Sequence, residues 1–501
     1  MTATALARFE AGLEAQRAGR PDAAISAYRD ALATDPAIAP AHYNLGHLLR
    51  ERGDMAGAAL AFDAAVRLRP AAGDAWLNLG LCRETLGDLD TALQCYREAA
   101  VRDGRLAPTA WFNEGNVLRK MGDLDGAAAA FRRAGDASPD TAEVWLNLGN
   151  CLREIGQLPA ATDALGRALD ARPDWPEARW NLALSQLGLG RLAAGWDGYE
   201  SRWAMHGRSG ARDGGWPLWQ GERLDGCRLL VWREQGVGDE ILFATCLPDL
   251  VALGAEVTLL VDPRLVSLMR RGFPEIRVLA DGALAGEHFD YQIPLGGLPR
   301  ILRRTRADFR SRWSYLIPAR QDVARWGERL RPLGESVRVG VCWRSGVATG
   351  ERTRYYAALE HWFRVFEIPG VSYVNLQYGE CDAELGRIEA ATGATVHRWA
   401  DLDLKNDFDS VAALIWHLDL VITAPTAVSS LAGALGTETW QLDPGTDWTV
   451  FGEARSPWLP AVQLYRREAG ERTWTSAFDA VVDALRRRAG GLAALSTSFG
   501  V

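Results

Sequence analysis

Two glycines and two acidic residues form a turn near the middle of the chain that has the chemistry of a ligand site. Gly236 and Gly238 follow the apolar run 228–233, and Asp239 and Glu240 come next, before a helix expected at about 241–253. Open parallel sheets bind ligands where their strands end, and glycine lets a ligand approach the backbone closely. Asp239 or Glu240 would therefore face a cleft and accept a proton from a hydroxyl. The alternative is that the acids only cap the helix.

A second candidate site follows the apolar run LVIT at 420–423. A helix that begins there presents free N–H groups and the positive end of its dipole, which together bind phosphate. We expect Thr426, Ala427 and Val428 to supply these groups.

Basic side chains near strand ends could neutralise a phosphate. The candidates are Arg344, Arg352, Arg354 and Lys405. The chain holds only two lysines, so a retained lysine is mildly informative. The alternatives are solvated surface arginines and, for the lysine, an ion pair with Asp403 or Asp407 that contributes little stability.

Gln377 and Tyr378 end another apolar run and could read the base of a nucleotide. Packing at the end of a strand is at least as good an interpretation of both residues.

These residues require two sets of strands alternating with helices, which is typical of parallel sheets with crossover helices. The first lobe is expected at 216–320, with strands at 228–233, 256–261, 276–279 and near Tyr291. The second is expected at 321–490, with an opening helix at 321–333 and strands at 337–343, 371–379, 420–423 and 437–443. Two Rossmann-like lobes without a complete G-x-G-x-x-G fingerprint fit the GT-B glycosyltransferase arrangement better than a dehydrogenase. A nucleotide donor would lie in the cleft between them.

Five segments carry a resemblance, which covers essentially the whole chain: QGVGDEILFATCLPDL, VGVCWRSG, DFDSVAALIWHLDLVITAPTAVSSLAGALG, the DW at 447–448, and SPWLP. They look like the heptosyltransferase-type domain of bacterial tetratricopeptide-glycosyltransferase fusions. The fuller pattern WRSG...ERTRYY...VNLQYG...DLDLKNDFD is similar to an alphaproteobacterial subgroup that includes flagellin O-glycosyltransferases, some of which use nonulosonic acid donors.

The resemblance implies roles for individual residues. Asp239 matches the aspartate proposed as the catalytic base, and the arginines after the run 337–343 match a basic residue that neutralises the donor pyrophosphate. The chain departs from the family pattern D-T-A-x-x-H-L-A, because Pro425 replaces the aspartate and Ser430 the histidine. Side-chain roles at those two positions do not carry over, whereas phosphate binding by backbone groups can survive.

The first 205 residues repeat with a period of about 34, the period of tetratricopeptide repeats. Small and large residues recur in register: Gly12, Gly46, Gly80, Gly115 and Gly149; Ala24, Ala58, Ala92, Ala127 and Ala161; then Tyr28, Phe62, Tyr96, Phe131 and Leu165. Small residues let paired helices approach closely, and the large residue fills the gap between them. We expect an α-helical superhelix at 1–205, of about five repeats and a capping unit.

An asparagine recurs two residues before each glycine or its equivalent: Asn44, Asn78, Asn113, Asn147 and Asn181. A carboxamide offers a donor and an acceptor to an extended peptide, and the pattern resembles the asparagine ladder of the O-linked N-acetylglucosamine transferase superhelix, which holds acceptor polypeptides by their main chain. The alternative is that these amides satisfy polar groups of neighbouring repeats. We expect the ladder to bind an acceptor protein.

The leading hypothesis is a metal-independent enzyme that O-glycosylates Ser or Thr of a protein, with flagellin as the candidate acceptor. A transferase acting on a saccharide or lipid-linked acceptor and a non-catalytic repeat scaffold are the alternatives. We expect no cofactor beyond the nucleotide-sugar substrate, and the scattered cysteines show no metal-ligand spacing.

The net charge of −8 without a basic block argues against a nucleic-acid partner. The sequence shows neither a secretion signal at its start nor an apolar run of about 18 residues. These features predict a cytoplasmic protein without a membrane span.

Overall fold

The computed structural model describes residues 2–205, 212, 214–284, 286–309, 313–346, 356–468, 471 and 473–498. The chain divides into two compact units, Met1–Asn181 and Leu182–Val501. Residues 182–205, which the sequence analysis placed with the repeats, thus belong to the second unit. No helix within the described ranges is long and apolar enough to cross a membrane.

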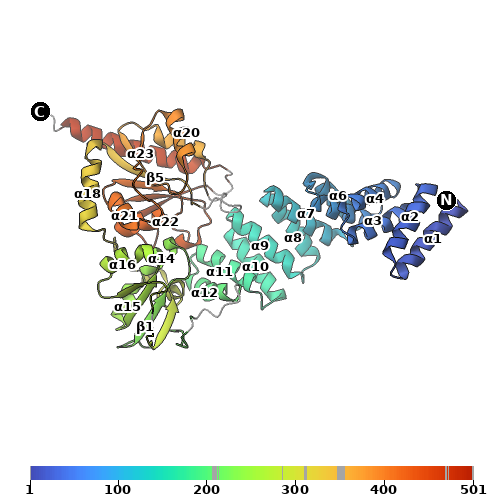
Figure 1. Ribbon diagram of the computed structural model, residues 1–501, viewed down its shortest axis with the longest axis horizontal. Helices are drawn as coiled ribbons and strands as arrows, with labels where there is room; N and C mark the ends of the chain where they lie inside the picture. Colours follow the sequence, from blue (N-terminus) through green and yellow to red (C-terminus); the bar gives the residue numbers. More distant parts are fainter. Residues whose placement is uncertain are drawn as a thin grey trace. The chain divides into compact units, whose positions relative to one another are not determined.

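The first unit is a stack of antiparallel helix pairs, drawn from blue to cyan in Figure 1. Its helices are α1 (Ala3–Arg17), α2 (Pro21–Thr34), α3 (Ala39–Glu51), α4 (Met55–Leu68), α5 (Gly73–Thr85), α6 (Leu89–Arg102), α7 (Ala107–Met121), α8 (Leu124–Ala137), α9 (Ala142–Ile155) and α10 (Leu158–Ala171). α11 (Pro176–Gly188) follows and continues into the second unit. The expected tetratricopeptide architecture is confirmed.

The recurring glycines are the points where the paired helices touch. A Cβ added to Gly115 would stand 2.7 Å from Cε1 of Phe131, and one on Gly80 would stand 2.7 Å from Cε1 of Tyr96. Both rings are fully buried. Only glycine leaves room for a large ring at this distance, which explains why the two residue types recur together.

Each of three repeats joins its helices with a glycine followed by an aspartate. Gly87 lies in the turn after α5 and adopts a positive φ of 82°, which residues with a side chain rarely adopt. Asp88 then caps α6, because its side chain accepts a hydrogen bond from the N–H of Thr91 at 3.3 Å. Gly53-Asp54 and Gly122-Asp123 repeat this arrangement.

After the end of α11, the second unit contains α12 (Leu192–Tyr199) and α13 (Arg202–Met205) and then forms two parallel sheets. The first sheet has the order β3-β2-β1-β4, formed by β1 (Arg228–Trp232), β2 (Glu256–Val261), β3 (Arg277–Ala280) and β4 (Tyr291–Pro294). Its helices are α14 (Val237–Ala244), α15 (Leu247–Ala252), α16 (Val266–Gly272) and α17 (Leu298–Leu302). The sequence predicted one helix from about 241 to 253, where the structure has α14 and α15.

The second sheet has the order β10-β9-β8-β5-β6-β7. Its strands are β5 (Val337–Cys342), β6 (Val371–Asn375), β7 (Val396–His397), β8 (Leu420–Thr423), β9 (Thr439–Asp443) and β10 (Val462–Arg466). The helices around it are α18 (Arg320–Leu330), α19 (Leu359–Phe366), α20 (Asp382–Thr392), α21 (Phe408–Trp416), α22 (Ala427–Leu435) and α23 (Thr475–Ser498). Two parallel sheets in sequence confirm the expected Rossmann-like lobes, and β7 and β10 are additions to the predicted strands.

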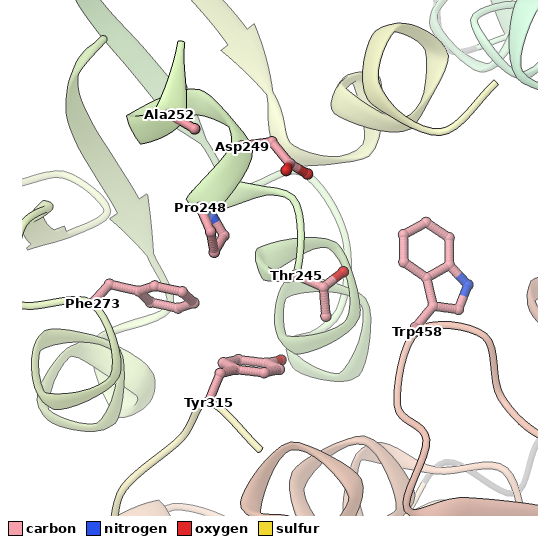
Figure 2. A pocket seen from close by; sticks show the side chains of 7 residues that line it. All are labelled: Thr245, Pro248, Asp249, Ala252, Phe273, Tyr315 and Trp458. Carbon is pink, nitrogen blue, oxygen red and sulfur yellow. The ribbon is translucent and has the colours of Figure 1, made fainter. Parts of the chain in front are cut away.

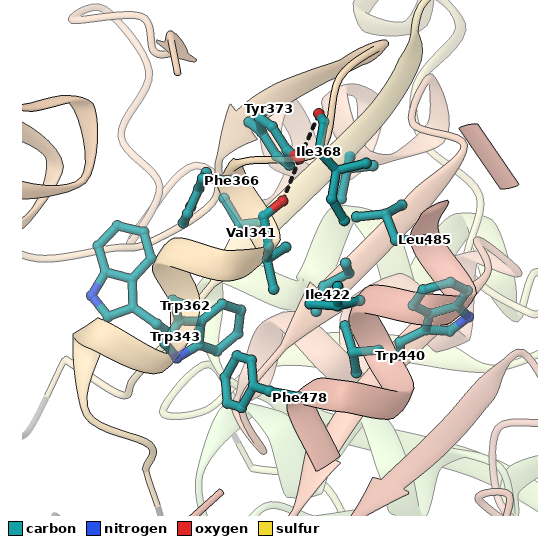
Figure 3. Packing of buried hydrophobic residues seen from close by; sticks show 14 of the residues in the cluster. Val341, Trp343, Trp362, Phe366, Ile368, Tyr373, Ile422, Trp440, Phe478 and Leu485 are labelled. Carbon is teal, nitrogen blue, oxygen red and sulfur yellow. Dashed lines mark hydrogen bonds between the residues drawn. The ribbon is translucent and has the colours of Figure 1, made fainter. Parts of the chain in front are cut away.

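The core of the second sheet explains why its strands read as continuous apolar runs. Val341 and Ile422 lie in neighbouring strands and pack with Trp362 of α19 and Phe478 of α23 (Figure 3). All of these side chains are buried. Strands of a parallel sheet that are covered by helices are apolar on successive residues, as seen here.

Candidate functional site

The two candidate turns, one from each sheet, lie against each other. A Cβ added to Gly238 in the first turn of α14 would stand 3.3 Å from the Cα of Ala427, the first residue of α22. The Oγ of Ser430 lies 3.5 Å from the same point. α14 follows the end of β1, and α22 follows the end of β8. Two helix N-termini therefore converge where strands of both sheets end, and each brings unsatisfied N–H groups and a positive dipole end.

Asp239 keeps partly exposed surface at this junction. Gly236 is the N-cap of α14, and its carbonyl accepts the N–H of Asp239 at 3.0 Å. The Oδ2 atom of Asp239 lies 3.5 Å from the position of a Cβ on Gly236, so the carboxylate lies over the first turn of its own helix. A carboxylate there is favoured by the helix dipole. This geometry is compatible with a base at the cleft and also with the helix-capping alternative.

The side chain of Glu240, in contrast, points into the interior of the protein. Its side chain is buried, and the Nε of Arg233 donates to Oε1 at 2.6 Å while the N–H of Asp262 donates to Oε2 at 2.8 Å. Burial raises the pKa of Glu240 to about 7, although Asp262 N–H and Arg233 oppose the shift. Glu240 thus ties α14 to the ends of β1 and β2, and Asp239 is the acidic residue of this turn with exposed surface.

The second-lobe turn has the expected helix start. Thr426 is the N-cap of α22, with its side chain accepting from the N–H of Val428 at 3.3 Å and its carbonyl from Ser429 at 3.0 Å. Thr426 and Ala427 are partly exposed, whereas the side chain of Val428 is buried. Any contact of Val428 with a ligand would involve its backbone N–H, which a ligand would share with the Thr426 side chain.

Arg344 is engaged by neighbouring groups of the same lobe. Its Nε donates to Glu384 Oε1 of α20 at 2.9 Å, its Nη2 also reaches that carboxylate, and Nη2 donates to the carbonyl of Glu380 at 2.8 Å. The hydrogen bond to Glu384 raises the pKa of Arg344. Its charge is therefore already balanced by Glu384. Arg352 and Arg354 lie outside the described residues.

Gln377 is buried and links the loops after β5 and β6. Its Oε1 accepts the N–H groups of Trp343 at 3.0 Å and Arg344 at 2.9 Å, and its Nε2 donates to the carbonyls of Arg344 at 3.0 Å and Tyr378 at 2.9 Å. These contacts correspond to packing at a strand end. Tyr378 is partly exposed beside Gln377, and burial raises the pKa of its hydroxyl.

Lys405 is exposed in a loop that reaches the first lobe. Nη1 of Arg264, which follows β2, donates to the carbonyl of Lys405 at 2.9 Å. The carboxylate of Asp403 accepts the N–H of Lys405 at 3.0 Å, and Asp407 caps α21. The backbone of Lys405 is therefore hydrogen-bonded at its carbonyl by Arg264 and at its N–H by Asp403.

The members of the asparagine ladder differ in burial and in hydrogen-bond partners. Nδ2 of Asn78 donates to Asp74 O at 2.8 Å, and Nδ2 of Asn147 donates to Glu143 O at 3.0 Å, each within its own helix. Nδ2 of Asn44 donates to the hydroxyl of Tyr28 in the preceding repeat at 3.3 Å. Asn78 and Asn181 are only 8% exposed, whereas the other members, Asn44, Asn113 and Asn147, are partly exposed.

One acidic group near the strand ends belongs to the DW segment but was given no role by the sequence analysis. Asp447 follows β9; its Oδ1 accepts the N–H and the hydroxyl of Thr449 at 2.9 and 2.6 Å, and its Oδ2 accepts Gln441 Nε2 at 3.3 Å. Burial raises its pKa, with the nearby Asp443 adding to the shift. The signal was the acidic pair in the segment QLDPGTDW directly after a predicted strand.

A separate cavity lies at the other end of α14. It has a volume of about 160 Å³ and is lined by Thr245, Pro248, Asp249, Ala252, Phe273, Tyr315 and Trp458 (Figure 2). Asp249 is held by Arg303, with Nη1 to Oδ2 at 2.6 Å. No group of three or more His, Cys, Asp or Glu residues in the described part of the chain is arranged to hold a metal ion.

Comparisons with known proteins match the first unit to a family. The family model described as tetratricopeptide repeat matches residues 9–72, 47–110 and 112–174. Protein FlbA of Caulobacter vibrioides is 37% identical over 311 residues, which cover 58% of this chain and 52% of FlbA. The match thus spans about half the length of that relative. It is longer than the first unit of this chain, so it includes part of the region with the two sheets.

Solved structures also resemble part of this chain. A crystal structure of MamA protein is 21% identical, covering 34% of this chain and 94% of that one with a TM-score of 0.33. A crystal structure of YrrB, described as a TPR protein with an unusual peptide-binding site, is 18% identical, covering 36% and 92% with a TM-score of 0.33.

Proposed function

We propose that the protein is a glycosyltransferase of the GT-B type that moves a sugar from a nucleotide donor to Ser or Thr of an acceptor protein. The observation that carries this proposal is the meeting of the N-termini of α14 and α22, marked by Gly238 against Ala427. Each helix follows a strand of a different parallel sheet. Ligand sites of open parallel sheets lie at such strand ends, so a nucleotide donor bound where the two turns meet would contact both.

The proposed reaction assigns one task to each turn. Asp239 accepts the proton of the acceptor hydroxyl as that oxygen forms a bond to the anomeric carbon of the sugar. The bond between that carbon and the phosphate oxygen breaks, and the nucleotide leaves with the bonding electrons. The N–H groups at 426–428 stabilise the negative charge that develops on the phosphate. Because these dipoles are already oriented, the proposal requires no metal ion.

The repeats are proposed to hold the acceptor protein. Tetratricopeptide repeats present an extended surface built from successive helices, and such surfaces bind proteins. Tethering an acceptor raises the local concentration of its hydroxyl groups at the transferase site, so weak recognition of each hydroxyl suffices. Flagellin as the acceptor and a nonulosonic acid as the sugar rest on the resemblance of the segments WRSG, VNLQYG and DLDLKNDFD to the flagellin-modifying subgroup.

A non-catalytic repeat scaffold is the second candidate, and specific contacts favour it. Pro425 and Ser430 replace two side chains of the family pattern. Arg344 is paired with Glu384, and the amide of Gln377 is used by backbone groups, so neither is available to a donor without rearrangement. A transferase with a saccharide or lipid-linked acceptor is the third possibility.

Intact-protein mass spectrometry of flagellin and other filament subunits tests the proposal. Subunits are compared from wild-type cells, a deletion strain and an Asp239→Asn strain. A sugar-sized mass difference that disappears in both mutants supports the proposal. With purified protein, Asp239→Asn should lower turnover by about 100-fold or more while donor affinity stays nearly unchanged. Transfer by the variant at the wild-type rate would exclude Asp239 as the base.

A further inference from the structure

The helix pair α12–α13 is joined to the loop that carries the candidate base. Nε of Arg202 donates to Glu234 Oε2 at 2.9 Å, and Nη2 of Arg202 donates to Oε1 of the same carboxylate at 2.9 Å. In the next position, Nε2 of Gln235 donates to the hydroxyl of Tyr199. Two successive residues of the loop after β1 are therefore each bound by a side chain from α12–α13.

These contacts are enclosed by the protein. The side chains of Arg202 and Glu234 are 7% and 5% exposed. The guanidinium of Arg202 also lies over the rings of Tyr199 and Trp203, at 4.5 and 4.6 Å from their centroids, and donates to Glu200 Oε1 at 2.7 Å. A guanidinium held by two parallel hydrogen bonds and two rings has one orientation available.

The opposite side of the loop is held by the backbone that follows β4. A Cβ on Gly296, in the 3-10 helix Leu295–Gly297, would stand 2.2 Å from Glu234 Oε1, and the backbone N–H of Gly296 hydrogen-bonds to the Glu234 carboxylate. The carboxylate of Glu234 thus accepts hydrogen bonds from both Arg202 and Gly296. Two residues later, Gly236 accepts the N–H of Asp239. The place of Asp239 therefore depends on where residues 234–236 are held.

We propose that Arg202 and Tyr199 are positioning residues that hold the loop 234–236 so that Asp239 faces the site, which makes α12–α13 a working part of the transferase. This inference rests on the proposed function for the role of Asp239. A buried ion pair contributes little net stability because both charges lose their hydration. Its two parallel hydrogen bonds restrict geometry, and a displacement of about 1 Å in a catalytic group can lower a rate by about 100-fold.

The experiment uses the full-length protein with three variants. Arg202→Lys keeps the charge and removes the two-pronged hydrogen bond, and Tyr199→Phe removes only the hydroxyl that Gln235 binds. Arg304→Ala is the matched control, because Arg304 pairs with Asp197 of the same helix α12 at 2.7 Å, and both side chains are about half exposed. Hydrogen exchange of peptides covering 234–240 and 420–436 is measured together with kcat and donor KM.

Arg202→Lys and Tyr199→Phe should speed exchange in 234–240 and leave 420–436 unchanged. They should also lower kcat by about 10- to 100-fold with donor KM within about twofold of wild type. Arg304→Ala should resemble wild type in every measurement. The inference is wrong if exchange in 234–240 does not change in Arg202→Lys, or if it rises while kcat stays at the wild-type value.

The exchange measurement needs no substrate, so it separates the inference from the proposed function. A wild-type protein that transfers no sugar contradicts the proposed function and the catalytic meaning of the positioning. The exchange result then still decides whether Arg202 and Tyr199 hold the loop.

Discussion

Gly238 and Ala427 stand so close that a Cβ on Gly238 would lie 3.3 Å from the Ala427 Cα. This distance is tighter than an ordinary carbon contact, so any side chain at 238 must push the N-terminus of α22 away. We expect Gly238→Leu to raise the dissociation constant of the donor by about tenfold or more, because moving the N-terminus of α22 disturbs the proposed phosphate site at 426–428. Isothermal titration with nucleotide donors measures the change.

Gly236→Ala is the control for that variant. A Cβ at 236 would meet only Asp239 Oδ2, at an ordinary 3.5 Å, and the backbone φ of −74° suits any residue. Gly236→Ala should therefore leave α22 in place and weaken donor binding less than Gly238→Leu does. Equal donor binding by wild type and Gly238→Leu would place the donor elsewhere.

The raised pKa of Glu240 predicts a pH dependence of stability. Its folded pKa of about 7 lies above its ordinary value of 4.5, so the folded state holds the proton more tightly. The contribution of Glu240 to stability is thus greatest below pH 4.5 and is lost progressively as the pH rises to about 7, by up to about 3 kcal/mol. Glu240→Gln cannot titrate and should lose less stability over this window.

Thermal unfolding of wild type and Glu240→Gln at intervals from pH 4.5 to 8 tests this expectation. The difference between the two proteins removes the contribution of the other titrating groups. A difference that does not vary with pH would mean that Glu240 is ionised throughout the window, with Arg233 outweighing the cost of its burial.

The close helix pairs of the repeats predict opposite effects at two glycines. A Cβ at Gly115 would lie 2.7 Å from the Phe131 ring, so Gly115→Ala should destabilise the first unit by about 1–3 kcal/mol. Gly166, inside α10, has nothing within 4 Å of its Cβ position, so Gly166→Ala should stabilise by about 0.5–1 kcal/mol. Denaturant unfolding, monitored by circular dichroism, compares the stability of the two variants. A change in the free energy of unfolding with the same sign in both would contradict the packing argument.

Trp196 of α12 is predicted to join both lobes of the second unit. Its ring, 1% exposed, meets Phe243 of α14 at 6.4 Å and Trp448 and Trp458, from the loops after β9, at 6.0 Å each. Trp196→Ala should lower the free energy of unfolding by about 3–5 kcal/mol. Its buried Nε1 has no hydrogen-bond partner in the described structure, so Trp196→Phe should cost much less. Thermal unfolding of the two variants tests this ranking, and equal losses would contradict it.

The partly exposed asparagines are predicted to differ from the buried ones in function. Replacing Asn44, Asn113 and Asn147 together with alanine should raise the KM for the acceptor protein and leave hydrolysis of the donor unchanged. Replacing Asn78 and Asn181, which are buried, should mainly lower the unfolding temperature. Acceptor affinity that is unaffected by the first set would indicate that the ladder serves the repeats themselves.

The repeats could be predicted from the sequence because their contacts are local. Gly80 and Tyr96 are 16 residues apart in adjacent helices, and the same spacing returns in each repeat, so the pattern itself encodes the pairing. The parallel sheets were predictable for a related reason, since buried strands such as β1 and β8 are apolar at nearly every position.

Only the tertiary structure decided which candidate side chains are available. Glu240 and Asp239 are neighbours in a helix, yet one is buried against Arg233 and Asp262 and the other is partly exposed, a difference set by the packing of α14 on the sheet. The pairing of Arg344 with Glu384, 40 residues away, has no local signal. Partners that are distant in sequence meet only through the arrangement of the sheets. The sequence alone therefore determined the repeats and the two lobes. Whether the side chains of Asp239, Glu240 and Arg344 are available to a ligand was decided by the tertiary structure.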